Sequence, residues 1–181
     1  MIITDLKKIS IHNHAIIENI SKASPNKKGK ITSKCDSCNY KKEKYILSPK
    51  TVTLKSSSYT YDGKVKKTTV KVTDTAGKSI SSSNYNVIYD RDCKNVGRYK
   101  VTVKFKGNYY EGSLSKTFDI IPKGTSFSSL KPQKKSVMLK WKKQTSQIDG
   151  YIIQYSISKK FAGKNYKLYS MWSGVKTVKV K

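Results

Sequence analysis

The pattern that most constrains the fold is a strict alternation of apolar and polar residues. Its longest run is Tyr99–Phe105, in which Tyr, Val, Val and Phe alternate with Lys and Thr. A period of two places the apolar side chains on one face of an extended strand, whereas a helix would scatter them around its axis. The run therefore predicts a β-strand with one buried face and one face in water.

Shorter runs of the same pattern recur along most of the chain. Their apolar positions are Val52 and Leu54; Val70 and Val72; Tyr85, Val87 and Tyr89; Phe118 and Ile120; Val137, Leu139 and Trp141; Tyr151, Ile153, Tyr155 and Ile157; and Val178 and Val180. Glycine-containing turn signals such as Asp62-Gly63 separate the runs. The predicted fold class is all-β, as tandem antiparallel β-sandwich modules, with Trp141 as a core anchor.

Two short proline-containing linkers divide the chain into three predicted segments. Ser48-Pro49-Lys50 and Pro122-Lys123-Gly124 mark the boundaries, which gives segments 1–46, 47–122 and 123–181. Within the first segment, residues 17–30 are polar, contain Pro25 and Gly29, and predict a hairpin loop or linker. A short helix over Ala15–Ala23 is the competing interpretation.

The chain is strongly basic, because it has 38 Lys and Arg and only 11 Asp and Glu, which gives a formal net charge of +27. A charge of this size attracts polyanions such as nucleic acid, anionic cell-wall polymers and acidic glycans. Arg91 and Arg98 are the only arginines in the sequence, and arginine is the side chain that reads guanine edges bidentately. We therefore expect no sequence-specific recognition of nucleic acid. The lysines are spread along the whole chain, which is also typical of a solvated surface.

The N-terminal residues lack the pattern of a secretory signal. Asp5, Lys7 and Lys8 interrupt the apolar stretch that such a signal needs. We expect either a piece of a longer secreted chain or, if the sequence is complete, a cytoplasmic protein. No apolar run approaches the ~20 residues of a membrane-spanning helix, so no membrane span is expected.

Several segments within 47–122 resemble a bacterial immunoglobulin-like repeat. In chain order they are Tyr59–Lys64, Val70–Gly77, Asn84–Tyr89, Asn95–Gly97 and Lys104–Tyr109. Such repeats occur in large surface and secreted proteins of Gram-positive bacteria. The resemblance implies an Ig-like β-sandwich and an extracellular or cell-surface location.

Residues 123–181 resemble a shortened fibronectin type III module. Val137–Trp141 is similar to its second strand, Gly150–Ser156 to its third, and Tyr169–Val178 to its last. The family has a further Tyr-rich stretch between the third strand and the Trp-Ser segment, which this chain lacks. A sandwich without those strands exposes sheet edges and part of its core.

One group of residues has the spacing of metal ligands. Cys35 and Cys38 are three apart, so a tight turn brings their thiols together, while His12 and His14 share a face of an extended strand. Two sulfur and two nitrogen ligands predict a closed, structural zinc site. A Cys35–Cys38 disulfide and two thiols without metal are the alternatives. The segment also resembles a small Cys/His hairpin unit that precedes such surface repeats.

The sequence carries no arrangement typical of an enzyme, because its two histidines lack a marked acidic partner and no phosphate-binding glycine loop is present. We predict a non-catalytic interaction or spacer module of a bacterial surface protein, contacting a cell-wall polymer, a glycan or a host protein. A polyanion-binding basic protein and an accessory domain of a secreted hydrolase are the alternatives. Tyr109 and Tyr110 are candidates for stacking on sugar rings or bases. Cys93 is an odd cysteine in a turn, and if exposed it could cross-link two chains. The oligomeric state is not predicted.

Overall fold

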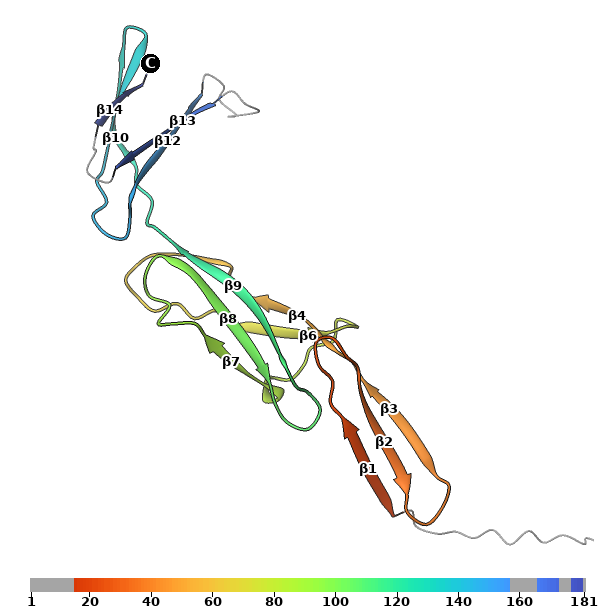
Figure 1. The fold of residues 1–181 in the computed structure, drawn as a ribbon. Helices are drawn as coiled ribbons and strands as arrows, with labels where there is room; N and C mark the ends of the chain where they lie inside the picture. Colours follow the sequence, from red (N-terminus) through yellow and green to blue (C-terminus); the bar gives the residue numbers. More distant parts are fainter. Residues whose placement is uncertain (1–14, 157–165, 173–176, 181) are drawn as a thin grey trace, which may run out of the picture. The chain divides into compact units, whose positions relative to one another are not determined.

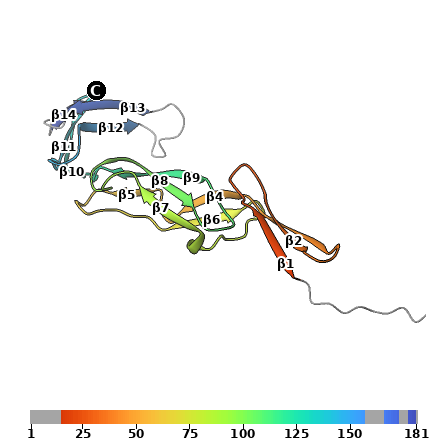
Figure 2. The same cartoon turned by 60° about the horizontal axis from the view of Figure 1, so that its bottom comes forward.

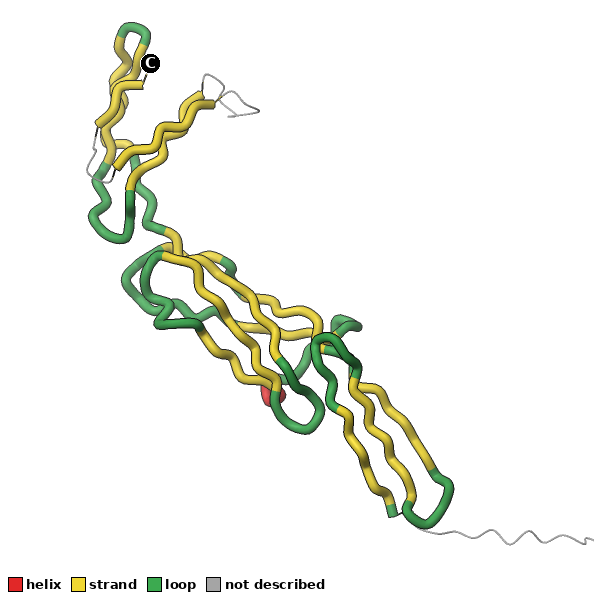
Figure 3. Tube along the Cα trace, viewed as in Figure 1, coloured by secondary structure: helices red, strands yellow, loops and turns green. Residues whose placement is uncertain are grey.

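The computed structural model describes residues 15–156, 166–172 and 177–180, and its regular elements are strands apart from one short 3-10 turn (Figures 1 and 3). The prediction of an all-β chain is confirmed. The elements are β1 (Ile16–Ser21), β2 (Gly29–Cys35), β3 (Lys41–Ile46), β4 (Pro49–Leu54), β5 (Ser58–Thr60), β6 (Val70–Asp74), η1 (Ser82–Asn84), β7 (Tyr85–Tyr89), β8 (Gly97–Phe105), β9 (Ser113–Ile121), β10 (Phe127–Gln133), β11 (Ser136–Trp141), β12 (Gly150–Ser156), β13 (Tyr166–Trp172) and β14 (Thr177–Val180).

Hydrogen bonding arranges the described strands in sheets of two to four members. Their orders are β1-β2-β3, β4-β6, β5-β9-β8-β7, β10-β11-β14 and β12-β13. Neighbours in sequence pair antiparallel, as β7 does with β8, because short turns connect them. The short β5 instead runs parallel to the end of β9, with Ser58 opposite Asp119.

The alternation in β8 is confirmed residue by residue. Tyr99, Val101, Val103 and Phe105 are at most 5% exposed, whereas Lys100 and Lys104 are exposed. One face of this strand therefore lies in the core and the other in water, as the period of two requires.

The chain divides into two compact units. The first contains residues 15–55, 69–89 and 100–116. Its core joins β4 and β6 to β7 and β8, and Figure 2 shows the β4–β6 pair lying against the β7–β8 ladder. The buried members of this core are Val52, Val72, Ile80, Tyr85, Val103 and Phe105. Two sheets packed face to face around such a core form a sandwich.

The N-terminal sheet belongs to this same unit and corrects two expectations. Residues 16–21 form strand β1, so the predicted loop or linker over 17–30 is wrong for its first part, and so is the alternative helix over Ala15–Ala23. Every residue of β1 pairs with β2, from Ile16 opposite Cys35 to Ser21 opposite Lys30. The sequence of β1 lacks a clear apolar–polar alternation, and pairing with β2 supplies its backbone hydrogen bonds.

The second unit contains residues 56–68 and 90–99 and the described part of 117–181. Phe118 is its most buried aromatic side chain, at 1% exposure. Its ring lies edge-on to Tyr59 at 5.7 Å and stacks on Tyr99 at 5.6 Å. Cys93 of the same unit is fully buried, so it is not the exposed odd cysteine that could cross-link two chains.

The C-terminal strands of this unit form two small sheets. Trp141 of β11 is 5% exposed and packs with Leu139 and Ile153, which agrees with its predicted place in the core. Tyr169–Val178, expected as one strand, instead contains most of β13 and the start of β14. These strands lie in different sheets, because β13 pairs with β12 and β14 pairs with β11.

Candidate functional site

One candidate site of the first unit is a groove of about 500 Å³. Residues of β2 and β3 form one wall, and the segments around Asp74–Asn84 and Tyr109–Tyr110 form the other. Backbone hydrogen bonds hold the walls together: the Ala23 amide donates to the Tyr109 carbonyl at 2.8 Å, and the Glu111 amide donates to the Ala23 carbonyl at 2.9 Å. The groove is therefore anchored by main-chain contacts and does not depend on side-chain packing alone.

Gly29 permits this close approach. A Cβ placed there would lie 2.5 Å from the Ala23 amide nitrogen and 2.6 Å from the Ser21 carbonyl oxygen. Both atoms belong to the backbone and cannot swing away as the end of a side chain can. The turn that carries Ala23 therefore requires glycine at the first position of β2.

Tyrosine rings line the groove. Tyr45 is 63% exposed and Tyr109 is 43% exposed, so both offer a ring face to a ligand. Tyr110 is half-buried and packs against Phe105 at 6.1 Å between ring centroids. Burial, followed by the charge of Asp74, raises the pKa of Tyr110. Of the two tyrosines predicted to stack on sugar rings or bases, Tyr109 is exposed, whereas Tyr110 packs against the core.

Lysines accompany these rings. Lys44 of β3 and Lys78 both line the groove and are exposed. The turn that presents Lys78 is fixed by Asp74, whose carboxylate accepts hydrogen bonds from the amides of Ala76 and Lys78, each at 2.9 Å. Aromatic faces beside ammonium groups suit a ligand with both rings and negative charge.

The Cys35–Cys38 turn lies at the end of β2. Cys35 is buried and Cys38 is half-exposed, and the Tyr40 amide donates to the Cys38 sulfur at 3.4 Å. That hydrogen bond lowers the pKa of Cys38, but burial and the neighbouring Cys35 thiol outweigh it, so the pKa is raised overall. The two thiols are thus near neighbours, as the spacing predicts.

The histidines of the predicted zinc site, His12 and His14, lie outside the described residues. Within 15–156, 166–172 and 177–180, no three His, Cys, Asp or Glu side chains gather in a metal-binding cluster. The four-ligand site therefore stays a prediction, and the described half of it is the Cys35–Cys38 pair.

Comparison with known families gives one match. Residues 50–124 match the family model of the MBG domain, a β-rich, non-catalytic type of domain found in bacterial surface proteins. A comparison with curated proteins finds no match. The matched residues run from β4 through β9 into the segment before β10. The comparison thus associates the middle of the chain with surface proteins.

In the described part of the chain, no helix has the length and apolar character needed to cross a membrane.

Tyr45 and the groove it lines are not predicted from the sequence. Tyr45 sits in β3, where four charged residues precede it (Lys41–Lys44), so the strand has no apolar alternation. Tyr45 shares the groove lining with Tyr109, which is far from it in sequence. The bridge between Ala23 and Tyr110 ties the Tyr109 loop to the segment that precedes β2. The sequence feature that points to this groove is the pair Tyr109-Tyr110, which lies between two glycines.

Proposed function

We propose that the chain is a non-catalytic interaction module of a bacterial surface protein, and that the groove at Tyr45 and Tyr109 contacts an anionic polymer that contains sugar rings. The observation that carries this proposal is the pairing of two exposed tyrosine rings with two lysines, Lys44 and Lys78, in one groove. The rings supply stacking and the lysines neutralise charge. The MBG match supports the surface location.

The proposed interaction module consists of two sandwiches. Residues 47–122 act as an Ig-like sandwich, and 123–181 as a shortened fibronectin type III module. The pair of sheets β10-β11-β14 and β12-β13 supports the second assignment, because two small sheets with a shared apolar core are what a reduced sandwich retains.

The test compares three polymers: a glycosylated teichoic acid, dextran as an uncharged polymer with rings, and polyphosphate as a charged polymer without rings. We expect the teichoic acid to bind most tightly and its affinity to fall with rising salt. Because one stacked ring contributes roughly 1–3 kcal/mol, Tyr45→Ala with Tyr109→Ala should weaken binding at least about tenfold. Tyr40→Ala, an exposed tyrosine outside the groove, is the matched control.

Equal binding of polyphosphate and teichoic acid, unchanged by the double substitution, would leave only unspecific attraction to the net charge of +27. No binding of any polymer at low salt would leave a spacer role for these sandwiches.

A structural zinc ion is a second proposal, which concerns stability and not recognition. The observation that favours it is the Cys35–Cys38 turn at the end of β2, which holds two cysteines, a ligand type that zinc prefers, three residues apart, with the Tyr40 amide donating to the Cys38 sulfur at 3.4 Å. Zinc would be held by Cys35 and Cys38 with His12 and His14. We expect one equivalent of zinc in protein purified under reducing conditions, lost in Cys35→Ser with Cys38→Ser. Zinc-free protein with an intact N-terminal sheet contradicts it.

A further inference from the structure

A hollow in the second unit has a basic lining that includes no acidic residue. Its volume is about 350 Å³, at the small end of the roughly 300–1000 Å³ of ligand pockets. The groove at Tyr45 and Tyr109 differs in this respect, because Asp74 lies in its lining beside the lysines. The residues that line the hollow are Lys123, Gly124, Thr125, Ser126, Lys142, Lys143 and Gln144.

Two chain segments form the hollow, and hydrogen bonds fix one against the other. The Lys142 amide donates to the Ser126 carbonyl at 3.1 Å, and the Thr125 hydroxyl donates to the Lys142 carbonyl. The Gln144 amide donates to the hydroxyl of Tyr151 at 2.7 Å. The backbone that carries the lysines is therefore tied to β12 and does not move as a free loop.

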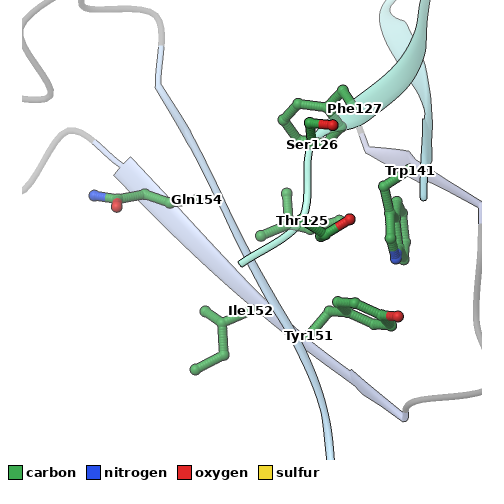
Figure 4. A pocket seen from close by; sticks show the side chains of 8 residues that line it. Thr125, Ser126, Phe127, Trp141, Tyr151, Ile152 and Gln154 are labelled. Atoms are coloured by element: carbon green, nitrogen blue, oxygen red, sulfur yellow. The ribbon is translucent and has the colours of Figure 1, made fainter. Parts of the chain in front are cut away.

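The other side of this anchor is a cavity of about 220 Å³, which Figure 4 shows with Thr125, Ser126 and Tyr151 in its lining. Tyr151 packs there against Trp141, with 5.3 Å between ring centroids. The Trp141 indole nitrogen is buried and has no hydrogen-bond partner in the described part of the chain, so no ligand reaches this donor. The lining of that cavity has no charged side chain, and the charged groups lie around the hollow.

The lysines of the hollow are not neutralised by the rest of the described chain. Lys123, Lys142 and Lys143 are all exposed, and within 15–156, 166–172 and 177–180 none of them takes part in an ion pair. Ammonium groups gathered around one hollow repel one another, and an anion between them removes that repulsion. Because they are exposed, their ammonium groups can reach an anion without any change in the core.

We propose that this hollow binds a phosphate group. Lysine binds phosphate as a point charge, and the oxygens of a phosphate point in several directions, so Lys123 of one segment and Lys142 and Lys143 of the other can contact it together. The Ser126 hydroxyl and the Gln144 carboxamide are neutral donors in the same lining. No aromatic residue lines the hollow, so it offers no stacking surface to a sugar or a base. The site lies in the second unit and does not rest on the groove proposed above.

Backbone amide signals provide a readout confined to this hollow. The full ¹⁵N-labelled chain is titrated in phosphate-free buffer at constant ionic strength, and the ¹⁵N–¹H signals of Gly124 and Ser126 are followed. The probes are inorganic pyrophosphate, which is free phosphate, and short poly(glycerol phosphate), whose phosphates are polymer diesters without sugar rings. Citrate presents negative charge on carboxylates alone. We expect both phosphate probes to shift the two signals to saturation, with citrate several-fold weaker, and the tighter phosphate probe identifies the source of the ligand.

Two variants of equal net charge separate a site from general attraction. Lys123→Gln with Lys142→Gln and Lys143→Gln removes three charges from the hollow. Lys64→Gln with Lys94→Gln and Lys131→Gln removes three from exposed positions of the same unit that do not line it. We expect the first variant to weaken the tighter phosphate probe at least about tenfold, through the loss of three exposed charge contacts, and the second to weaken it less than about twofold. All six positions are exposed, so the melting temperature should stay unchanged.

Three results would overturn the proposal. The first is that neither phosphate probe shifts the Gly124 and Ser126 signals. The second is that both triple variants lose affinity equally, which would assign the binding to net charge. The third is that citrate binds as tightly as the phosphate probes. Tyr45→Ala with Tyr109→Ala should leave these shifts unchanged, so a failure of the groove and a failure of this hollow are measured separately.

Discussion

Replacing Phe118 by alanine tests how the second unit is held together. The side chain is 1% exposed in β9, between the rings of Tyr59 and Tyr99. Alanine leaves a cavity that these rings cannot close without leaving their own backbone positions. The substitution therefore removes both the buried surface of Phe118 and two aromatic contacts at 5.6–5.7 Å.

The expected loss is large because transfer and cavity effects add. Phe→Ala substitutions in well-packed cores cost about 3–5 kcal/mol. In a domain of 60–100 residues, 1 kcal/mol corresponds to roughly 4–8 °C in Tm, so a loss of about 4 kcal/mol lowers Tm by about 20 °C. This is a large part of the ~5–15 kcal/mol by which domains are stable.

The measurement is thermal and urea unfolding followed by circular dichroism, with Ile121→Ala as the control. Ile121 lies in the same strand but is 47% exposed, so its truncation should cost under about 1 kcal/mol. If both variants melt within a few degrees of the unsubstituted chain, Phe118 is not in a packed core. β9 would then not bury its alternate residues Phe118 and Ile120 in a core.

Three further outcomes are expected. Gly29→Ala should cost about 1–3 kcal/mol or more, because its Cβ meets backbone atoms, and hydrogen exchange should show the loss as lower amide protection in β1 and β2. Arg98 holds the pKa of Asp119 below its usual range, so their ion pair stabilises the fold above the unfolded carboxyl pKa of ~3.9 and the contribution disappears as pH falls through the lowered folded pKa; acid titrations of Asp119→Asn should lack this step. Cys93 is fully buried, which also raises the pKa of its thiol, whereas Cys38 is half-exposed, so iodoacetamide should reach Cys38 in chelator-treated folded protein and Cys93 only in urea, as mass spectrometry can measure.

The sequence predicts strands best where one face of the strand is buried and the other is wet. β8 is the clear case, because its apolar residues occupy every second position and only that face of the strand is buried. The sequence does not predict β1 and β3 in this way, because they lack the alternation of apolar and polar residues. Most of their side chains are exposed on both faces, so pairing with β2 fixes them and no hydrophobic pattern does.

The candidate site is less predictable than the strands. Tyr109 is visible in the sequence as an aromatic beside glycine, but the lysines and Tyr45 of its groove come from segments far apart in sequence. Backbone hydrogen bonds such as Ala23 to Tyr109 and Thr75 to Ser48 bring these segments together. Likewise, burial of Trp141 follows from alternation, but the missing partner of its indole nitrogen does not. Whether a buried donor is satisfied depends on which side chains the neighbouring sheet supplies.

Polymer binding in the groove at Tyr45 and Tyr109 should respond to salt, because lysines are part of its lining. Lys44 and Lys78 line the groove, and exposed charges are screened over about 8 Å at physiological ionic strength. Polymer binding there should therefore weaken steeply between low and physiological salt. Dextran carries no charge and releases no counterions, so any binding of dextran should not change over the same range. A salt titration of the teichoic acid with dextran in parallel checks this, and an affinity for teichoic acid that does not change with salt would mean that Lys44 and Lys78 do not neutralise its charge.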